Sequence, residues 1–171
     1  QFQISDMLTQ LSDLLRYSLD KDSSDTVTLR DDIRWLKTYI NFQKKRFNKK
    51  IDVIFNVDPF VLDFRIPKLL IQPLVENSII HGLACVDRNG LIIINIQGHN
   101  NEIYFEIIDN GAGIESDKLT EIVSEDNAGM GIKNVQERLK LYYGESYGLE
   151  VKSEIGQGVR ISFRIPRNNY L

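Results

Sequence analysis

The chain has 171 residues, and its 21 basic and 24 acidic side chains give a net charge of −3. It therefore lacks the cationic surplus that sequence-independent binding to DNA or RNA requires. Cys85 is the single cysteine, which excludes an internal disulfide framework, and no apolar run reaches the roughly 20 residues of a membrane-spanning helix. The length suits one domain with a short helical extension. Because the chain begins at Gln1 in a helical pattern, we expect a piece of a longer protein.

Two amphipathic helices are predicted near the amino terminus. Apolar residues recur at steps of three and four over residues 4–18, and a polar stretch at 20–25 reads as a linker. Thr28 and Asp31 then form a capping-box pattern, in which the acid reaches back to the first free amides of a second helix. The apolar stripe of that helix comprises Leu29, Ile33, Leu36, Ile40 and Phe47.

Residue 51 begins a change of pattern. Apolar and polar residues alternate over 51–57, which predicts a strand. Pro67 then suits the first position of a helix, which we expect to run to about His81 and to stop at Gly82.

The remaining elements alternate hairpins and helices. In chain order we expect a hairpin of 91–97 and 103–108 with a polar tip at 99–101, a short helix over 116–123, a polar stretch at 124–128, a helix over 131–142, and a hairpin of 149–153 and 159–165. A mixed sheet covered by helices on one face, a two-layer α/β sandwich, satisfies this order best.

Two glycine-containing segments could serve a ligand. Gly129 and Gly131 precede a helix, where free amides and the helix dipole favour an anion, although such a pair is more often a tight entry turn. Asp109 follows a buried strand, where a carboxylate needs partners. It either caps the next turn or accepts a hydrogen bond from an amino group such as that of adenine.

A third segment could hold a metal. Asn77 and His81 are four residues apart and share a face of an otherwise apolar helix. An asparagine oxygen is a hard ligand that suits Mg²⁺ when phosphate oxygens complete the shell. The alternative is a hydrogen-bonded structural asparagine and a buried histidine without a ligand.

Taken together, the order and spacing of these segments resemble the GHKL superfamily of ATP-binding domains, whose fold is the Bergerat fold. Leu74–Ser78 through His81–Gly82 is similar to the N box, 109–114 to the G1 box and 129–132 to the G2 box. Residues 155–158 resemble the last glycine pair of that fold.

The resemblance narrows to sensor histidine kinases of the LytS/YesM type and covers essentially the whole chain. The matching segments are 14–19, 27–29, 39–43, 46–47, 66–77 and 134–139. It implies that 1–48 is the end of the dimerisation and phosphoacceptor region and that 49–171 is the catalytic ATP-binding domain.

For the phosphate side of the site, the resemblance implies that Asn77 holds Mg²⁺ against the phosphates of ATP, with Glu76 and His81 lining the same side. Gly129 and Gly131, followed by Ile132, would shape the lid over the nucleotide and its hinge, the lid itself being about 115–128.

For the base side, the same likeness implies that Asp109 bonds the adenine amine. Gly111 and Gly113 would let the backbone pass close to the base, and Ile114 would form part of its apolar wall.

Departures from the superfamily pattern refine the expected activity. Pro73 occupies the place of the general-base glutamate of ATP-hydrolysing members, so hydrolysis should be slow. Val159 replaces a threonine whose hydroxyl lies near the adenine in many relatives. Its absence would remove one water-mediated contact, which is a minor effect on binding. The acceptor motif of these kinases is absent, since His81 and His99 are the only histidines, so we expect that this segment cannot phosphorylate itself.

The function implied by the resemblance is that of the cytoplasmic catalytic portion of a bacterial inner-membrane sensor. As a protein histidine kinase it would bind ATP with Mg²⁺, donate the γ-phosphoryl group to an upstream histidine within a homodimer, and relay it to a response-regulator aspartate. The alternatives are an ATP-dependent binding module such as an anti-sigma kinase, a nucleotide-gated mechanical domain, and an α/β domain whose glycines are only turns.

Overall fold

A five-stranded mixed sheet forms the centre of the computed structural model, which describes residues 25–47, 50–115 and 130–167. The strands are β2 (Ile51–Val57), β4 (Gly90–His99), β5 (Glu102–Asp109), β6 (Glu150–Glu154) and β7 (Gly158–Pro166), in the order β2-β4-β5-β7-β6. β2 runs parallel to β4, and the other neighbouring pairs are antiparallel. The two predicted hairpins are therefore confirmed.

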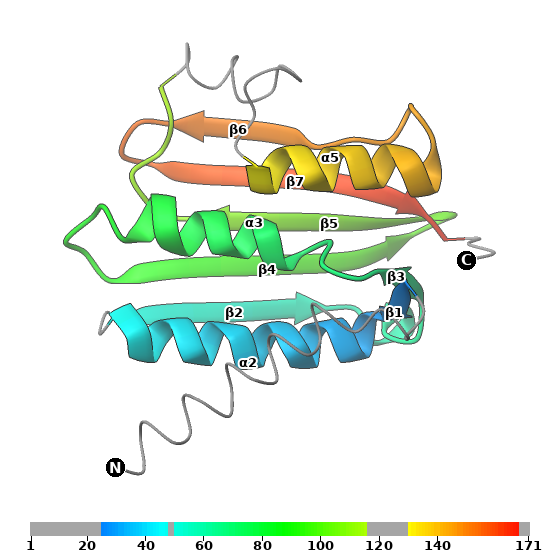
Figure 1. Cartoon of the computed structure of the whole chain (residues 1–171), viewed down its shortest axis with the longest axis horizontal. Coiled ribbons are helices and arrows are strands. Elements are labelled where there is room, and N and C mark those ends of the chain that lie inside the picture. Colours follow the sequence, from blue (N-terminus) through cyan, green and yellow to red (C-terminus); the bar gives the residue numbers. More distant parts are fainter. Residues whose placement is uncertain (1–24, 48–49, 116–129, 168–171) are drawn as a thin grey trace.

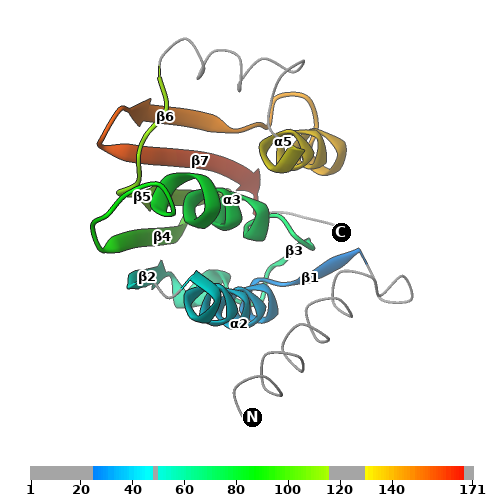
Figure 2. The same cartoon turned by 60° about the vertical axis from the view of Figure 1, so that its left-hand side comes forward.

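The helices lie on one face of this sheet (Figure 1). They are α2 (Leu29–Phe47), α3 (Gln72–Asn77), which continues directly into the π-helix η2 (Ser78–Leu83), and α5 (Met130–Tyr143). Seen after a turn of the molecule, they form a layer of their own beside the strands (Figure 2). The two-layer α/β sandwich expected from the sequence is confirmed.

Isoleucine-rich strands form the sheet side of the core. Alternate residues of β4, β5 and β7 are buried, as period-two alternation dictates for a sheet with one covered face. Phe105 and Phe163 are register partners whose rings stack with centroids 4.6 Å apart. Helix residues that complete the core include Leu36, Ile40, Leu74, Ile79, Val135 and Leu139.

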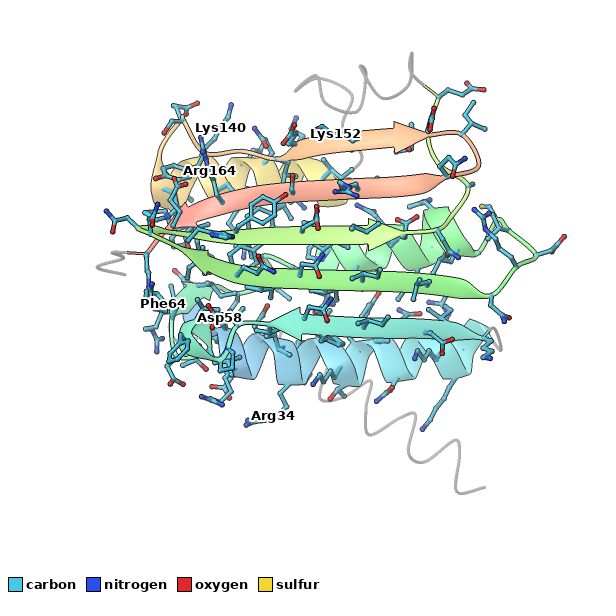
Figure 3. All side chains as sticks on the ribbon, turned by 180° about the vertical axis from the view of Figure 1, so that it is seen from behind. Arg34, Asp58, Phe64, Lys140, Lys152 and Arg164 are labelled. Atoms are coloured by element: carbon cyan, nitrogen blue, oxygen red, sulfur yellow. The ribbon has the colours of Figure 1, made fainter. Side chains whose placement is uncertain are left out.

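The opposite face of the sheet carries no helix among the described residues (Figure 3). A row of hydrogen bonds crosses it from Asn56 through Asn95 and Glu106 to Arg160, with donor–acceptor distances of 2.7 to 2.9 Å. This face is therefore held by polar side chains, and the site must be sought on the helical side.

The start of α2 confirms the predicted cap with one difference. The Asp31 amide donates to Thr28 Oγ1 at 3.2 Å, and the Thr28 hydroxyl donates to the Asp31 carboxylate at 2.8 Å. The acid thus reaches the threonine hydroxyl, while the free amides of Leu29 and Arg30 donate to backbone carbonyls of the 62–64 loop. The stripe of α2 is buried as predicted at Leu29, Ile33, Leu36 and Ile40, and the side chain of Phe47 lies outside the described part.

The predicted helix start at Pro67 is wrong. Pro67 ends β3 (Arg65–Pro67), a short strand that pairs antiparallel with β1 (Thr26–Thr28). Leu69 then adopts φ +58°, which no α-helix accommodates, so helical structure begins only at Gln72. Pro73 is the proline that lies in the first helical turn.

Several predicted segments lie outside the described residues: the helix over 4–18, most of the linker at 20–25, the short helix over 116–123 and the polar stretch at 124–128. The helix predicted over 131–142 is confirmed by α5. Among the described helices, none combines the length and apolar character needed to cross a membrane.

Candidate functional site

A cavity of about 930 Å³ opens between α3–η2, the loop after β5, the start of α5 and the β6–β7 turn. Eight of the residues expected from the sequence line it: Glu76, Asn77, His81, Asp109, Gly113, Ile114, Gly131 and Ile132. Three segments that are far apart in the sequence thus meet around one space. Gly129 lies outside the described residues.

Asp109 is the buried charge of this site. It is the last residue of β5, and only 3% of its surface is exposed. Its carboxylate accepts hydrogen bonds from the Ser78 hydroxyl at 2.8 Å, the Gly111 amide at 2.8 Å and the Val159 amide at 3.3 Å. Burial nevertheless raises the pKa of Asp109, because desolvation outweighs these three donors. With three donors in place, a carboxylate retains capacity to accept a further hydrogen bond from a ligand.

Glycine makes the floor of the cavity possible. A Cβ on Gly82 would lie 3.1 Å from Asp109 Oδ1, and one on Gly111 would lie 2.5 Å from the Gly82 carbonyl carbon. The Ala112 amide donates to the Gly82 carbonyl at 3.1 Å, so the loop after β5 and the π-helix touch through their backbones. Gly111 therefore supports the floor from behind and does not line the cavity.

Asn77 and Gly131 bring α3 and α5 together on the other side. A Cβ on Gly131 would come within 3.1 Å of the Asn77 side-chain nitrogen and 3.4 Å of its oxygen. The absence of a side chain at this helix start thus leaves room beside a hard oxygen donor, which fits a cation bound together with phosphate oxygens. Asn77 is the last residue of α3, where the π-helix begins, a feature found frequently at functional sites.

Glu76 is tied to helix α2 by a buried tyrosine. Tyr39 is 5% exposed, its hydroxyl accepts from Gln43 Nε2 at 2.8 Å, and it bonds the Glu76 carboxylate. Burial, followed by the charge of Glu76, raises the pKa of Tyr39 far above its usual range, so the hydroxyl stays protonated and can donate. No feature of the residue pattern indicates that α2 reaches this side of the cavity.

Apolar side chains form the remaining walls. Ile114 lines the cavity as expected, and the structure adds Ile80, Ile155 and Ile161, which sequence reasoning missed. Ile155 is 65% exposed, although it is an isoleucine in a turn rich in glycine. An isoleucine in such a turn was the available signal, because a large apolar side chain there needs a partner to cover it.

The two residues that depart from the superfamily pattern also lie at the cavity. Pro73 lines it one helical turn before Asn77, and Val159 lines it while its amide holds Asp109. His81 is exposed and lies at the rim, whereas His99 is exposed at the end of β4 and is absent from the lining.

Comparison with known families matches both halves of the chain. Residues 63–169 match the histidine kinase-, DNA gyrase B- and HSP90-like ATPase family, and residues 1–51 match the histidine kinase family.

Among individual relatives, the chain is 33% identical to the sensor histidine kinase YpdA of Escherichia coli over 94% of this chain and 28% of that protein. It is 34% identical to the sensor protein LytS of Oceanobacillus iheyensis over 95% of this chain and 29% of that protein. The sensor histidine kinase YesM of Bacillus subtilis is also 34% identical, over 99% of this chain and 29% of its own length. The chain thus spans less than a third of the length of each of these three relatives.

Solved structures share the fold at low sequence identity. The catalytic domain of the histidine kinase ThkA superposes with a TM-score of 0.64 at 20% identity, covering 83% of this chain and 96% of that one. The histidine kinase domain of the blue-light activated kinase from Erythrobacter litoralis gives 0.62 at 16% identity, covering 84% and 64%. The resemblance to LytS- and YesM-type kinases is confirmed, and the chain belongs to the histidine kinase-, DNA gyrase B- and HSP90-like ATPase family.

Proposed function

We propose that this chain is the catalytic ATP-binding portion of a bacterial two-component sensor histidine kinase. The observation that carries the proposal is Asp109, a buried carboxylate whose three protein donors leave it able to accept one more hydrogen bond, at the floor of a cavity with apolar walls. The exocyclic amine of adenine can donate there, whereas the carbonyl oxygen of guanine at the same place would be repelled. The site should therefore prefer ATP and ADP to guanine nucleotides.

The phosphates would lie on the α3–α5 side of the cavity. The Asn77 oxygen would be the protein ligand of Mg²⁺, and Gly131 leaves space beside it at the start of α5. When bound, Mg²⁺ neutralises charge on the phosphate oxygens during phosphoryl transfer. Glu76, held by Tyr39, and His81 at the rim complete this side.

Pro73 bears on the reaction class. It lies in the first turn of α3, one turn before Asn77, where a carboxylate would be placed to activate water. Proline offers no proton acceptor, so ATP hydrolysis should be slow. The site then suits transfer of the γ-phosphoryl group to a side chain that another segment supplies.

The acceptor and the partners lie outside the described structure. The two histidines of the chain are the rim residue His81 and the distant His99, so we propose that the acceptor histidine lies elsewhere in a longer protein and that this segment cannot phosphorylate itself. We further propose a homodimeric kinase, cytoplasmic at this portion and anchored in the inner membrane. A response-regulator aspartate would receive the phosphoryl group, as the solved complex of ThkA with the response regulator TrrA suggests for that kinase.

A nucleotide titration tests the proposal. At about 100 times Kd, a bound nucleotide adds roughly 2.7 kcal/mol to the free energy of unfolding, or about 5–10 °C in Tm for a domain of this size. We expect that shift with ATP and ADP but not with GTP. Asp109→Asn should abolish it, and Asn77→Ala should remove its dependence on Mg²⁺.

The matched control is Asn41→Ala, which changes an exposed asparagine of α2 outside the cavity lining and should leave the shift intact. Absence of any shift with adenine nucleotides in the folded protein would overturn the proposal. Acid-labile phosphohistidine formed on the isolated chain would contradict the statement that it cannot phosphorylate itself.

A further inference from the structure

Arg88 makes an unusual set of contacts beside the cavity. It lies in the loop between η2 and β4, and its guanidinium donates to three backbone carbonyl oxygens. Nε donates to Asn110 at 2.9 Å, and Nη2 donates to Gly111 at 2.9 Å and to Gly156 at 2.8 Å. One side chain thus joins the loop after β5 to the β6–β7 turn.

These two segments together form one wall of the cavity. The Gly156 amide donates to the Ala112 carbonyl at 2.7 Å, and the Ile114 amide donates to Ser153 Oγ at 2.8 Å. The backbones are so close that a Cβ on Gly113 would lie 2.1 Å from the Glu154 carbonyl oxygen. Ile114 comes from one segment and Ile155 from the other, and both line the cavity.

The loop that carries Arg88 is itself fixed. Asn110 accepts from the Leu91 amide at 2.7 Å through its side-chain oxygen and donates to the Asn89 carbonyl at 3.1 Å through its side-chain nitrogen. Its own amide donates to the Leu91 carbonyl at 3.2 Å. Arg88 therefore extends from a loop that is already tied to the segment it holds, so its guanidinium is set in place before a ligand arrives.

The chemistry of the guanidinium suits this task. It is planar and carries five N–H donors in a fixed fork, so it can serve several carbonyls at once, which a lysine ammonium cannot do with the same geometry. Every hydrogen bond that Arg88 makes to a described residue goes to a main-chain carbonyl. The residue acts on the position of the backbone, in contrast to the surface arginines that pair with a carboxylate, such as Arg34 with Asp31.

We propose that Arg88 is a positioning residue for the nucleotide base, holding the wall that carries Ile114 and Ile155 at the spacing the adenine ring needs. The inference rests on the proposed nucleotide-binding function. Without the clamp, part of the binding free energy would be spent in ordering the two segments, and we expect about a tenfold loss of ADP affinity. The test must separate this role from simple attraction between a positive charge and the phosphates.

Calorimetric titration of ADP with Mg²⁺ into wild type, Arg88→Ala and Arg88→Lys makes that separation. If Arg88 positions the wall, both variants lose about tenfold in affinity while their far-UV spectra and free energies of unfolding show a folded protein. If it acts through its charge, Arg88→Lys binds like the wild type, and the inference is overturned. Should Arg88→Ala fail to fold, Arg88→Lys alone still decides between these outcomes. Arg34→Ala is the matched control and should bind normally.

A double-mutant cycle with Ile155→Ala supplies a readout that a merely structural role would not move. If Arg88 acts through the turn that carries Ile155, the double variant should lose less affinity than the product of the two single losses. Independent, multiplicative losses would overturn the inference. Asp109→Asn, run in parallel, keeps the two proposals apart: failure of wild type to bind ADP, or normal binding by Asp109→Asn, counts against the proposed function, whereas normal binding by the Arg88 variants counts against Arg88 alone.

Discussion

Asp109 is a buried carboxylate in the lining of the candidate site, and its burial affects the stability of the fold. Its carboxylate is buried, and burial raises its pKa in the folded protein above the ordinary value of 3.8. At pH values between 3.8 and the raised pKa, the Asp109 carboxyl group binds more protons in the folded state than in the unfolded chain. The free energy of unfolding contributed by this group must therefore fall as pH rises through that window and stay level above it.

Asp109→Asn isolates this contribution, because the asparagine oxygen can still accept from Gly111 and Val159 while its nitrogen donates to Ser78. We expect the unfolding free energy of the wild type, relative to this variant, to decline as pH rises from about 4 through the raised pKa. Urea denaturation at a series of pH values measures the difference. If the free energy of unfolding of the wild type instead increases relative to the variant as pH rises, the three hydrogen-bond donors, and not burial, dominate the pKa shift of Asp109.

Gly158 tests how closely the site is packed. It has φ +96°, and a Cβ there would lie 1.9 Å from the Asp109 carbonyl oxygen. Gly156, in the same turn, has φ +78° but open space around it. Gly156→Ala should lower the free energy of unfolding only by the strain of a left-handed backbone conformation, about 1–2 kcal/mol.

Gly158→Ala should cost a further 1–3 kcal/mol or so, because the methyl group also collides with backbone that cannot move away. Urea denaturation of both variants gives the comparison, with Gly156→Ala as the control for backbone strain. Equal losses in the free energy of unfolding would mean that the β6–β7 turn can shift away from β5, which would contradict the close backbone packing at Gly158.

At the scale of elements, α2 contributes to the site as well as to the core. Tyr39 links Gln43 on its own helix to Glu76 on α3. Tyr39→Phe removes the hydroxyl and leaves the buried Gln43 and the half-buried Glu76 without this hydrogen-bond partner, which should lower the free energy of unfolding by about 1–3 kcal/mol. Tyr142→Phe, at a half-buried tyrosine of α5, is the matched control and should change it little. An unchanged free energy of unfolding in Tyr39→Phe would show that the Tyr39 hydroxyl contributes nothing to holding α2 against α3.

Periodicity predicted most elements because each face of a strand or helix repeats in the sequence. The alternation of 51–57 and the stripe of α2 both follow from one buried side. The start of α3 was predicted at the wrong residue because Pro67 suits a first helical turn and a strand end equally well. The choice was made by the pairing of β3 with β1 and by the positive φ of Leu69, neither of which is visible locally.

At the scale of the whole molecule, motif spacing picked out residues that line one cavity, but it did not pick out the residues that support that cavity. Asn77, Asp109 and Gly131 were chosen because the chemistry of the proposed ligand restricts which residue types could bind it, and all three line the cavity. Arg88 and Tyr39 act through contacts between segments far apart in the sequence, and their residue types are ordinary for a loop and a helix. Ile155 lies between these cases, since an isoleucine in a glycine-rich turn is a weak sequence signal and its 65% exposure in the folded chain strengthens it.

The arrangement of the sheet predicts how nucleotide binding should spread through the molecule. β4 and β5 are hydrogen-bonded on both sides and should exchange their amide protons only by global unfolding. β6, among the described strands, pairs with β7 alone and should open locally. Opening of β6 would disturb the turn that carries Ile155 and so destroy the cavity wall.

At ADP about 100 times above Kd, global unfolding becomes roughly 100-fold rarer, and amides of β4 should slow by that factor. Because opening β6 should also release the nucleotide, its amides should slow by a comparable factor. β1 supplies the control, since the small β1–β3 sheet lies outside the cavity lining and its local opening should be nearly indifferent to ADP. Hydrogen exchange followed by mass spectrometry, with and without ADP, measures all three. If β6 responds as little as β1, the β6–β7 turn does not hold the nucleotide, and the cavity wall must be formed by the loop after β5 alone.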